Sequence, residues 1–365
     1  MADAWVLSVP QPPWQADVLE EVGIEPLRPV QIFLEEYDGP DLPQLTRGNG
    51  GALLSAPPAA IGMLLAEMGE PWRSLGEEAL RPAPRALRLP RGTMPLGERA
   101  YVMGIVNVTP DSFSDGGRFS GVERACAHAL ELQAQGADII DIGGESTRWY
   151  QRAHRGADGT LEERVTLDEE LQRVVPVLEE LRGKLDVPIS IDTYKWPVAE
   201  AALRLGAEIV NDVTAGQADP EMLAGTARHG AAIVLMHAQE EPEYRSVGAE
   251  VRRHLRARAR AAESLGIPRD AIVLDPGIGF GKKPEHDYAV LRMLPSLRAL
   301  GYAVLSGPSR KSFLGAATGR PITERLHATV AVAALSVALG ADIVRVHDVT
   351  EAVDGVRVAD RTVRG

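Results

Sequence analysis

The residues best suited to chemistry follow a short apolar run at Tyr101–Val106. The run stops at Asn107, and residues 108–117 add two aspartates, three hydroxyl residues and a Gly-Gly pair. Carboxylate and amide oxygens suit a metal ion or a cationic intermediate, while hydroxyl groups and freely turning backbone suit a phosphate. A solvated connection between a strand and a helix has the same composition. The loop by itself therefore leaves both interpretations open.

Acidic and amide residues also end other apolar runs along the chain. They are Asp192, Asn211, Asp212 and Asp275. One aspartate in such a place often does no more than cap the next helix. Its repetition indicates a single site to which several elements contribute. Carboxylates and an amide there suit a flat heterocycle with several N–H donors, at about 1.5–3 kcal/mol for each charge-assisted hydrogen bond.

Basic residues from two later segments form the second half of this site. Arg345 and His347 stand two positions apart on one apolar run, so their side chains face the same way along a strand. With Lys311 nearby, they are interpreted as an anion clamp, with Asn107 and the region of Thr147 opposite. A histidine alone would more simply be structural, and its pairing with Arg345 favours the anion site.

Alternating apolar runs and helical patterns from about residue 98 onward explain how these residues meet. The runs occupy residues 101–106, 138–142, 188–192, 208–212, 231–236, 271–275, 302–306 and 342–346. They are β-branched and show little alternation, as in strands buried on both faces. Eight such units predict a TIM (β/α)8 barrel, whose active site lies at the carboxyl ends of its strands. A doubly wound open sheet is the alternative, but the first loop carries no dinucleotide-type GxGxxG.

The intervening helical patterns are separated from the following strands by glycines. The patterns occupy 122–135, 168–182, 196–205, 220–229, 248–265, 286–300, 324–339 and 350–358. The glycines are Gly136, Gly206, Gly230, Gly266, Gly301 and Gly340. Each is expected at the C-terminal cap of its helix.

Residues 1–97 differ from this pattern, being rich in proline. They are interpreted as a small N-terminal α/β domain of unknown role, followed by a Pro-rich linker that ends with RPAPRALRLPRG at Arg81–Gly92. Residues 98–365 are then the barrel. The expected fold class is therefore α/β, a TIM barrel preceded by a small α/β domain.

Composition excludes several classes of protein. The 365 residues are 45% hydrophobic with a net charge of −12, which argues against a nucleic-acid-binding surface. The one cysteine, Cys126, rules out an intrachain disulfide and a Cys-rich metal site. No secretory signal and no membrane-spanning run of about 18 apolar residues are seen. The expectation is a cytoplasmic protein without a nucleic-acid or membrane partner.

Eight segments together closely resemble dihydropteroate synthase, over nearly three quarters of the chain. They are MGIVNVTPDSFSDGG, IDIGGESTR, ISIDT, IVNDV, LMH, LDPGIGFGK, GPSRKSFLG and RVHDV, in the family's order. The resemblance implies a TIM barrel and a transferase of folate biosynthesis. In the implied reaction, 6-hydroxymethyl-7,8-dihydropterin pyrophosphate condenses with p-aminobenzoate, giving 7,8-dihydropteroate and pyrophosphate. A Mg²⁺ cofactor and a homodimer are implied as well.

The resemblance and the residues together assign a set of roles. Pterin binding is expected of Asp192, Asn211, Met236, Asp275 and Lys311. Pyrophosphate binding is expected of Asn107, Thr147, Arg345 and His347, with Asn107 also binding Mg²⁺. The residues proposed to contact p-aminobenzoate are Phe113 and Ser312. The catalytic set is Asp111, Asp192, Asp275 and Lys311, whose carboxylates would stabilise the cation left when pyrophosphate departs.

Two alternatives remain open, the first of them because of one departure from the family pattern. Where the family usually continues with Pro-Gly after Arg148, this chain has Trp149-Tyr150-Gln151 and a long insert. A non-catalytic, pterin-binding paralogue is one alternative. A pterin-dependent methyltransferase barrel is the other, although it would bind no pyrophosphate.

Overall fold

The computed structural model describes residues 3–6, 30–35, 37–48, 51–56, 58–73, 76, 84, 86–108, 117–145 and 165–364. The chain divides into two compact units. One comprises Met1–Ala83 with Pro295–Tyr302, and the other comprises Pro84–Leu294 with Ala303–Gly365. Among the described residues, no helix combines the length and apolarity needed to cross a membrane.

The small unit is a four-stranded antiparallel sheet with a helix. Its strands are β1 (Asp3–Val6), β2 (Val30–Glu35), β4 (Gly51–Ala56) and β3 (Leu45–Gly48), in that spatial order. Alternate residues of β4, including Ala52 and Leu54, are buried. They belong to one core with Leu65 of α2 (Pro58–Met68), so one face of the sheet is covered. The expected small α/β domain is thus an antiparallel sheet with one described helix.

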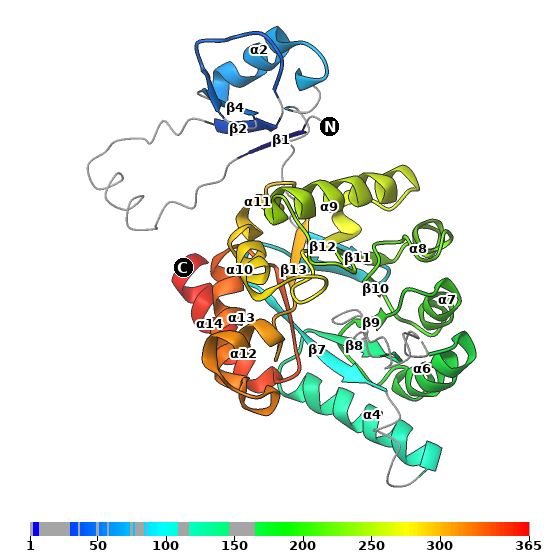
Figure 1. Ribbon diagram of the computed structural model, residues 1–365. Helices are drawn as coiled ribbons and strands as arrows, with labels where there is room; N and C mark the ends of the chain where they lie inside the picture. The colour runs from blue at the N-terminus through cyan, green and yellow to red at the C-terminus, as the bar shows by residue number, and fades with distance from the viewer. Residues whose placement is uncertain are drawn as a thin grey trace. The chain divides into compact units, whose positions relative to one another are not determined.

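The large unit is a closed barrel of parallel strands, which confirms the TIM barrel (Figure 1). In chain order the strands are β7 (Tyr101–Asn107), β8 (Ile139–Gly143), β9 (Ile189–Asp192), β10 (Ile209–Asp212), β11 (Ala232–Met236), β12 (Ile272–Asp275), β13 (Ala303–Ser306) and β14 (Ile343–Val346). Pairing of β14 with β7 closes the ring. The strands are buried almost throughout, which explains their lack of apolar–polar alternation.

Helices follow the strands much as the sequence predicts. They are α4 (Gly117–Ala134), α6 (Leu167–Leu181), α7 (Trp196–Arg204), α8 (Met222–His229), α9 (Val247–Ser264), α10 (Pro284–Arg292), α11 (Leu294–Arg298), α12 (Ser312–Thr318), α13 (Leu326–Ala338) and α14 (Val349–Arg364). All six glycines expected at helix ends have positive φ angles, between 64° and 107°. This is the left-handed conformation that glycine adopts without a steric penalty.

Two helical assignments from the sequence need correction. The pattern at 286–300 is two helices, because Pro295 near the break lacks an N–H and disfavours helical backbone at the residue before it. The extra helix α12 was missed altogether. It spans Ser312–Thr318 and is capped by Gly319, whose φ is 71°. It lies between β13 and α13, so the seventh strand is followed by a short additional helix.

A β-hairpin precedes the barrel and belongs to the same unit. It is formed by β5 (Ala86–Leu89) and β6 (Gly92–Pro95). Arg88 pairs with Asp270 at 2.9 Å, and Arg91 pairs with Glu208 at 2.6 Å. Glu208 immediately precedes β10 and Asp270 lies two residues before β12, so the hairpin lies at the amino ends of the strands. The sequence boundary at residue 97 had placed this hairpin with the N-terminal domain.

Candidate active site

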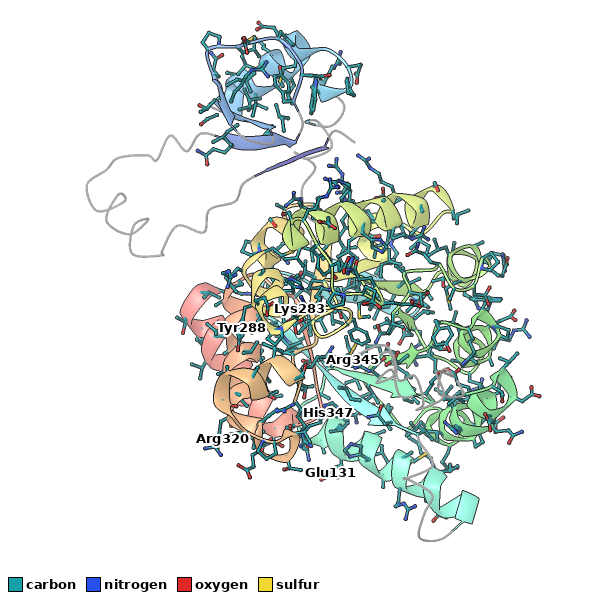
Figure 2. The ribbon with its side chains drawn as sticks, in the orientation of Figure 1. Glu131, Lys283, Tyr288, Arg320, Arg345 and His347 are labelled. Atoms are coloured by element: carbon teal, nitrogen blue, oxygen red, sulfur yellow. The ribbon has the colours of Figure 1, made fainter. Side chains whose placement is uncertain are left out.

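The carboxyl ends of the barrel strands bring the acidic, amide and basic residues together. Asn107 ends β7, Asp192 ends β9, Asp275 ends β12, and Arg345 lies within β14. Register places Asn107 beside Gly143 of β8, and Gly143 beside Asp192 of β9. Figure 2 shows Arg345 and His347 coming from the same end of the barrel. The parallel barrel therefore brings residues that are far apart in the sequence into one cluster.

Asp141 of β8 is the shared acceptor at the centre of this cluster. Its Oδ2 accepts from Nδ2 of Asn211 at 3.0 Å and from Nε of Arg345 at 2.6 Å. Nη2 of Arg345 also donates to Oδ2 of Asp192 at 2.6 Å. Asp141 is fully buried, so its charge requires these partners.

Arg345 thus joins the acidic half of the site instead of standing apart from it. The sequence interpretation grouped Arg345 with His347 in a separate anion clamp. In the structure, its side chain is one-fifth exposed and bonded to two buried carboxylates. A guanidinium at this depth requires anionic partners, and Asp141 and Asp192 supply them. A guanidinium has five N–H donors, so the bonds to Asp141 and Asp192 leave capacity for a further anion.

Burial shifts the protonation of both kinds of charged residue. It raises the pKa of Asp192 to about 7, with Asp141 adding to the rise and Arg345 opposing it. Burial likewise raises the pKa of Asp275, against the attraction of Lys311. It lowers the pKa of Lys311 to about 8, while Asp275 and Asp287 act in the opposite direction. Both acid and base thus titrate close to neutrality, as groups in catalytic sites often do.

Lys311 and Asp275 meet at the loop that follows β12. Oδ1 of Asp275 accepts from the backbone N–H of Gly277 at 2.7 Å. Nζ of Lys311 donates to the carbonyl of Ile278 and lies 4.2 Å from the centroid of the Phe280 ring. A cation over an aromatic face is electrostatically favoured. The Phe280 ring is therefore held against the ammonium group.

An apolar wall adjoins the charged cluster. Tyr194, Val213, Met236 and Phe280 form one buried group. Met236 lies next to Asp275 in the register of β11 and β12. A flat ring bound by the carboxylates would find apolar and aromatic surface here. Met236, assigned to pterin binding from the sequence, lies in this buried group.

The loop after β13 holds His347 and presents the first turn of α12. Oγ of Ser309 lies 2.9 Å from Nδ1 of His347 and accepts the His347 backbone N–H at 3.1 Å. Arg310 donates through Nε to Asp348 at 2.9 Å. Lys311 is the N-terminal cap residue of α12, and Ser312 is its first residue. Hydrogen bonds therefore connect the segment that carries Lys311 and Ser312 to the segment that carries His347.

Several sequence assignments lie outside the described residues. These are Asp111, Phe113 and Thr147, together with the insert beginning at Trp149. Conversely, two residues that lie within quoted motifs had no role assigned to them. Asp141 lies inside a strand rather than at its end, and Phe280 stands in a Gly-rich loop. The unusual acid within the otherwise apolar strand of residues 139–143 was the available signal for Asp141.

Comparison with known proteins agrees with this geometry. The pterin binding enzyme family model matches residues 103–347. A curated dihydropteroate synthase from Synechocystis is 45% identical over 272 residues, covering 72% of this chain and 90% of its own length. This chain belongs to the dihydropteroate synthase family.

Solved structures of dihydropteroate synthases share the barrel. One from Clostridium difficile, determined in the presence of pteroic acid, is 44% identical with a TM-score of 0.69, and the match covers 74% of this chain and 99% of that one. One from Xanthomonas albilineans, in complex with 7,8-dihydropteroate, is 44% identical with a TM-score of 0.63, covering 71% and 92%. The matched part corresponds in extent to the barrel.

Proposed function

We propose that the barrel condenses 6-hydroxymethyl-7,8-dihydropterin pyrophosphate with p-aminobenzoate, forming 7,8-dihydropteroate and pyrophosphate. The observation that carries the proposal is the buried group of Asp141, Asp192, Asn211 and Arg345 at the barrel mouth. This group combines acceptors for a heterocycle with a cation for the leaving group. Membership of the dihydropteroate synthase family supports the same reaction.

The pterin ring would bind to the acids and the amide. Ring N–H groups would donate to Asp192 and Asp275, while Asn211 supplies both a donor and an acceptor. Departure of pyrophosphate leaves positive charge on the exocyclic carbon and the ring. Fixed carboxylates in a buried site would stabilise that charge without reorganising. Asp111, which follows β7 in the sequence, is proposed to add a third.

Arg345 and His347 would hold the pyrophosphate leaving group. Arg345 already lies among the site's acids, and the N–H groups not bonded to Asp141 and Asp192 would contact phosphate oxygens. His347 is oriented by Ser309. Thr147 is proposed to complete this subsite.

p-Aminobenzoate would bind where the loops after β12 and β13 meet. Lys311, which is also assigned to the pterin and acts on Asp275, offers a cation, Ser312 a hydroxyl, and Phe280 an aromatic ring. A carboxylate on an aromatic ring matches this set. Phe113 is proposed to cover the same ring, and the arylamine would then face the electrophilic carbon.

Mg²⁺ is proposed as the cofactor, with the amide oxygen of Asn107 among its ligands. No group of three or more His, Cys, Asp or Glu side chains suited to a metal occurs within the described parts of the chain. A single amide at the strand end fits Mg²⁺, which usually takes one or two protein ligands and completes its shell with water and substrate phosphates. When bound, the ion supplies charge neutralisation for the leaving group.

A homodimer and a cytoplasmic location are further parts of the proposal. Leu335 of α13 is 57% exposed and Val358 of α14 is 69% exposed, and these two helices pack against each other. Such apolar side chains suit a surface covered by a second copy. Sedimentation should detect the dimer, and Leu335→Glu should shift it toward monomer.

A cytoplasmic location is consistent with one buried, unpaired cysteine.

The test is a direct assay of both products. Purified protein is incubated with the pterin pyrophosphate, Mg²⁺ and p-aminobenzoate, and dihydropteroate and pyrophosphate are measured. We expect the two in equal amounts. Pyrophosphate release without dihydropteroate would favour a paralogue whose altered sequence after Arg148 no longer admits p-aminobenzoate. Pterin binding with neither product would favour the non-catalytic paralogue or the methyl-transfer alternative.

A further inference from the structure

Lys282 lies beside the active site but has no part in the chemistry described above. It follows the loop that carries Gly279 and Phe280 and precedes α10. Its ammonium group lies 3.0 Å from Nδ1 of His237, 3.1 Å from the carbonyl of Phe280 and 3.4 Å from the carbonyl of His237. It therefore links the end of β11 to the loop after β12.

The three acceptors match the three donors of the ammonium form of Lys282, whose pKa burial lowers to about 7 while Asp287 and Asp275 act in the opposite direction. Burial lowers the pKa of His237 to about 2, so its imidazole is neutral. Because Nδ1 accepts from Lys282, the imidazole proton belongs on Nε2. Two backbone carbonyls supply the remaining acceptors. Among the natural amino acids, only lysine carries three N–H donors on a single nitrogen at the end of a stem of this length.

The loop held in this way is also packed backbone to backbone. A Cβ on Gly277 would lie 1.8 Å from the carbonyl oxygen of His237, and one on Gly281 would lie 1.9 Å from that of Gln239. Asp287 accepts the N–H of Gly279 at 2.6 Å. The path of residues 277–281 is consequently fixed at several points.

Phe280 is the residue on which these restraints converge. Its backbone carbonyl is bonded to Lys282, while its ring lies 4.2 Å from the ammonium of Lys311. A displacement of the carbonyl would rotate the peptide and move the ring relative to Lys311. The two lysines thus act on opposite ends of one residue, its backbone and its ring.

We propose that Lys282 is a positioning residue that fixes residues 277–281, and through Phe280 sets the subsite for the aromatic second substrate. The inference rests on the proposed function for the identity of that substrate. Of the residues assigned to the pterin, Asp192 and Asn211 have no hydrogen bond to Lys282 or to residues 277–281 among the described contacts, and Asp275 contacts that loop through the N–H of Gly277. The subsite for the pterin should therefore be affected much less than that for p-aminobenzoate.

The experiment compares the wild type with Lys282→Met and with Lys283→Met. Methionine keeps the length of the stem and removes all three donors. Lys283 is the exposed neighbour and provides the matched control. For Lys282→Met we expect the KM for p-aminobenzoate to rise about tenfold, the effect of losing one useful hydrogen bond to a charged group. The KM for the pterin pyrophosphate should change by less than about twofold. Lys283→Met should match the wild type in both.

Hydrogen exchange provides a readout that does not depend on turnover. Amides of residues 277–281 should exchange faster in Lys282→Met, whereas those of β7 and β8 should not. Lys282→Gln, which retains two donors, should lie between methionine and the wild type if the methionine variant folds poorly. Equal rises in both KM values, or unchanged exchange at 277–281, would overturn the positioning role. If the wild type makes no dihydropteroate, the proposed function fails, and exchange alone still decides whether Lys282 fixes the loop.

Discussion

Protonation of two buried residues should limit the pH range of the reaction. Asp192, with a pKa of about 7, must be ionised to accept N–H donors, so activity should rise as pH increases through about 7. Lys311, with a pKa of about 8, must be charged to bind a carboxylate, so activity should fall above about 8. We therefore expect a narrow bell-shaped profile of kcat/KM against pH.

Three variants assign the two limbs of that profile. Asp192→Asn should lose the acidic limb along with much of the rate, and Lys311→Arg should move the alkaline limb to higher pH. His128→Gln is the control, because this exposed histidine on α4 lies away from the strand ends. An acidic limb that persists in Asp192→Asn would assign it to another group. Because Asp192, Asp141 and Arg345 interact, the limb is a property of that group.

At the scale of single residues, the sequence revealed the site's composition better than its pairing. Asp192, Asn211 and Asp275 could be identified because they interrupt apolar runs where strands end. Arg345 could be placed on the correct strand, but its bond to Asp141 depends on the register between β14, β7 and β8. Register is a long-range property that no local pattern contains. Buried charges pair with whichever acid the register brings near.

The elements that flank the site are joined by a second buried group of charges. Nζ of Lys195 lies 2.6 Å from Glu145, which follows β8, and 2.5 Å from Glu170 in the first turn of α6. Glu145 and Glu170 are almost fully buried, and Tyr194 donates to Glu145. Lys195 therefore neutralises two carboxylates and connects three elements.

Removing the ammonium group of Lys195 should lower the free energy of unfolding far more than removing one at the surface. Lys195→Met would leave two buried carboxylates without their cation, lowering the free energy of unfolding by about 3 kcal/mol or more. Lys184→Met is the matched control, since Lys184 and Glu180 form an exposed pair within one helix, and we expect a change within about 0.5 kcal/mol. Urea unfolding measures both.

A second substitution tests the cause of that loss. Adding Glu170→Gln to Lys195→Met removes one of the two stranded charges and should restore part of the stability. If the double variant is no more stable than Lys195→Met, buried like charges are not the origin of the effect. Similar losses in Lys195→Met and Lys184→Met would contradict the argument directly.

The elements themselves were predictable to the extent that they follow local rules. All eight strands were found because a strand buried on both faces is a short β-branched run bounded by polar residues. Glycine positions marked the helix ends. The short helix α12 was missed because its seven residues, SFLGAAT, show no amphipathic period long enough to recognise. Its existence depends on the packing of Phe313 and Leu314, which are both buried.

At the scale of the whole molecule, the boundary of the catalytic unit can be tested by truncation. The relatives match the barrel and little else, since 90% of the Synechocystis protein's length aligns with 72% of this chain. A chain of residues 84–365 keeps the hairpin with the barrel and should form dihydropteroate with a kcat/KM within about twofold of the full chain. Loss of activity from this truncated chain would show that the first unit contributes to the site.

A chain of residues 98–365, cut at the boundary suggested by proline content, should be less stable. It lacks Leu87 and Leu89, which are 1% and 8% exposed, and burial of each such side chain is worth about 1.5–3 kcal/mol. It also lacks the half-exposed ion pair of Arg88, worth at most about 1 kcal/mol, and the pair of Arg91 with the buried Glu208. We expect urea unfolding to show a loss of about 3 kcal/mol or more relative to residues 84–365, with a large part from the two leucines. Replacing Arg88 alone by methionine in the 84–365 chain measures the exposed pair, because that variant should lose at most about 1 kcal/mol. If the two truncated chains unfold alike, the hairpin is not part of the barrel's core.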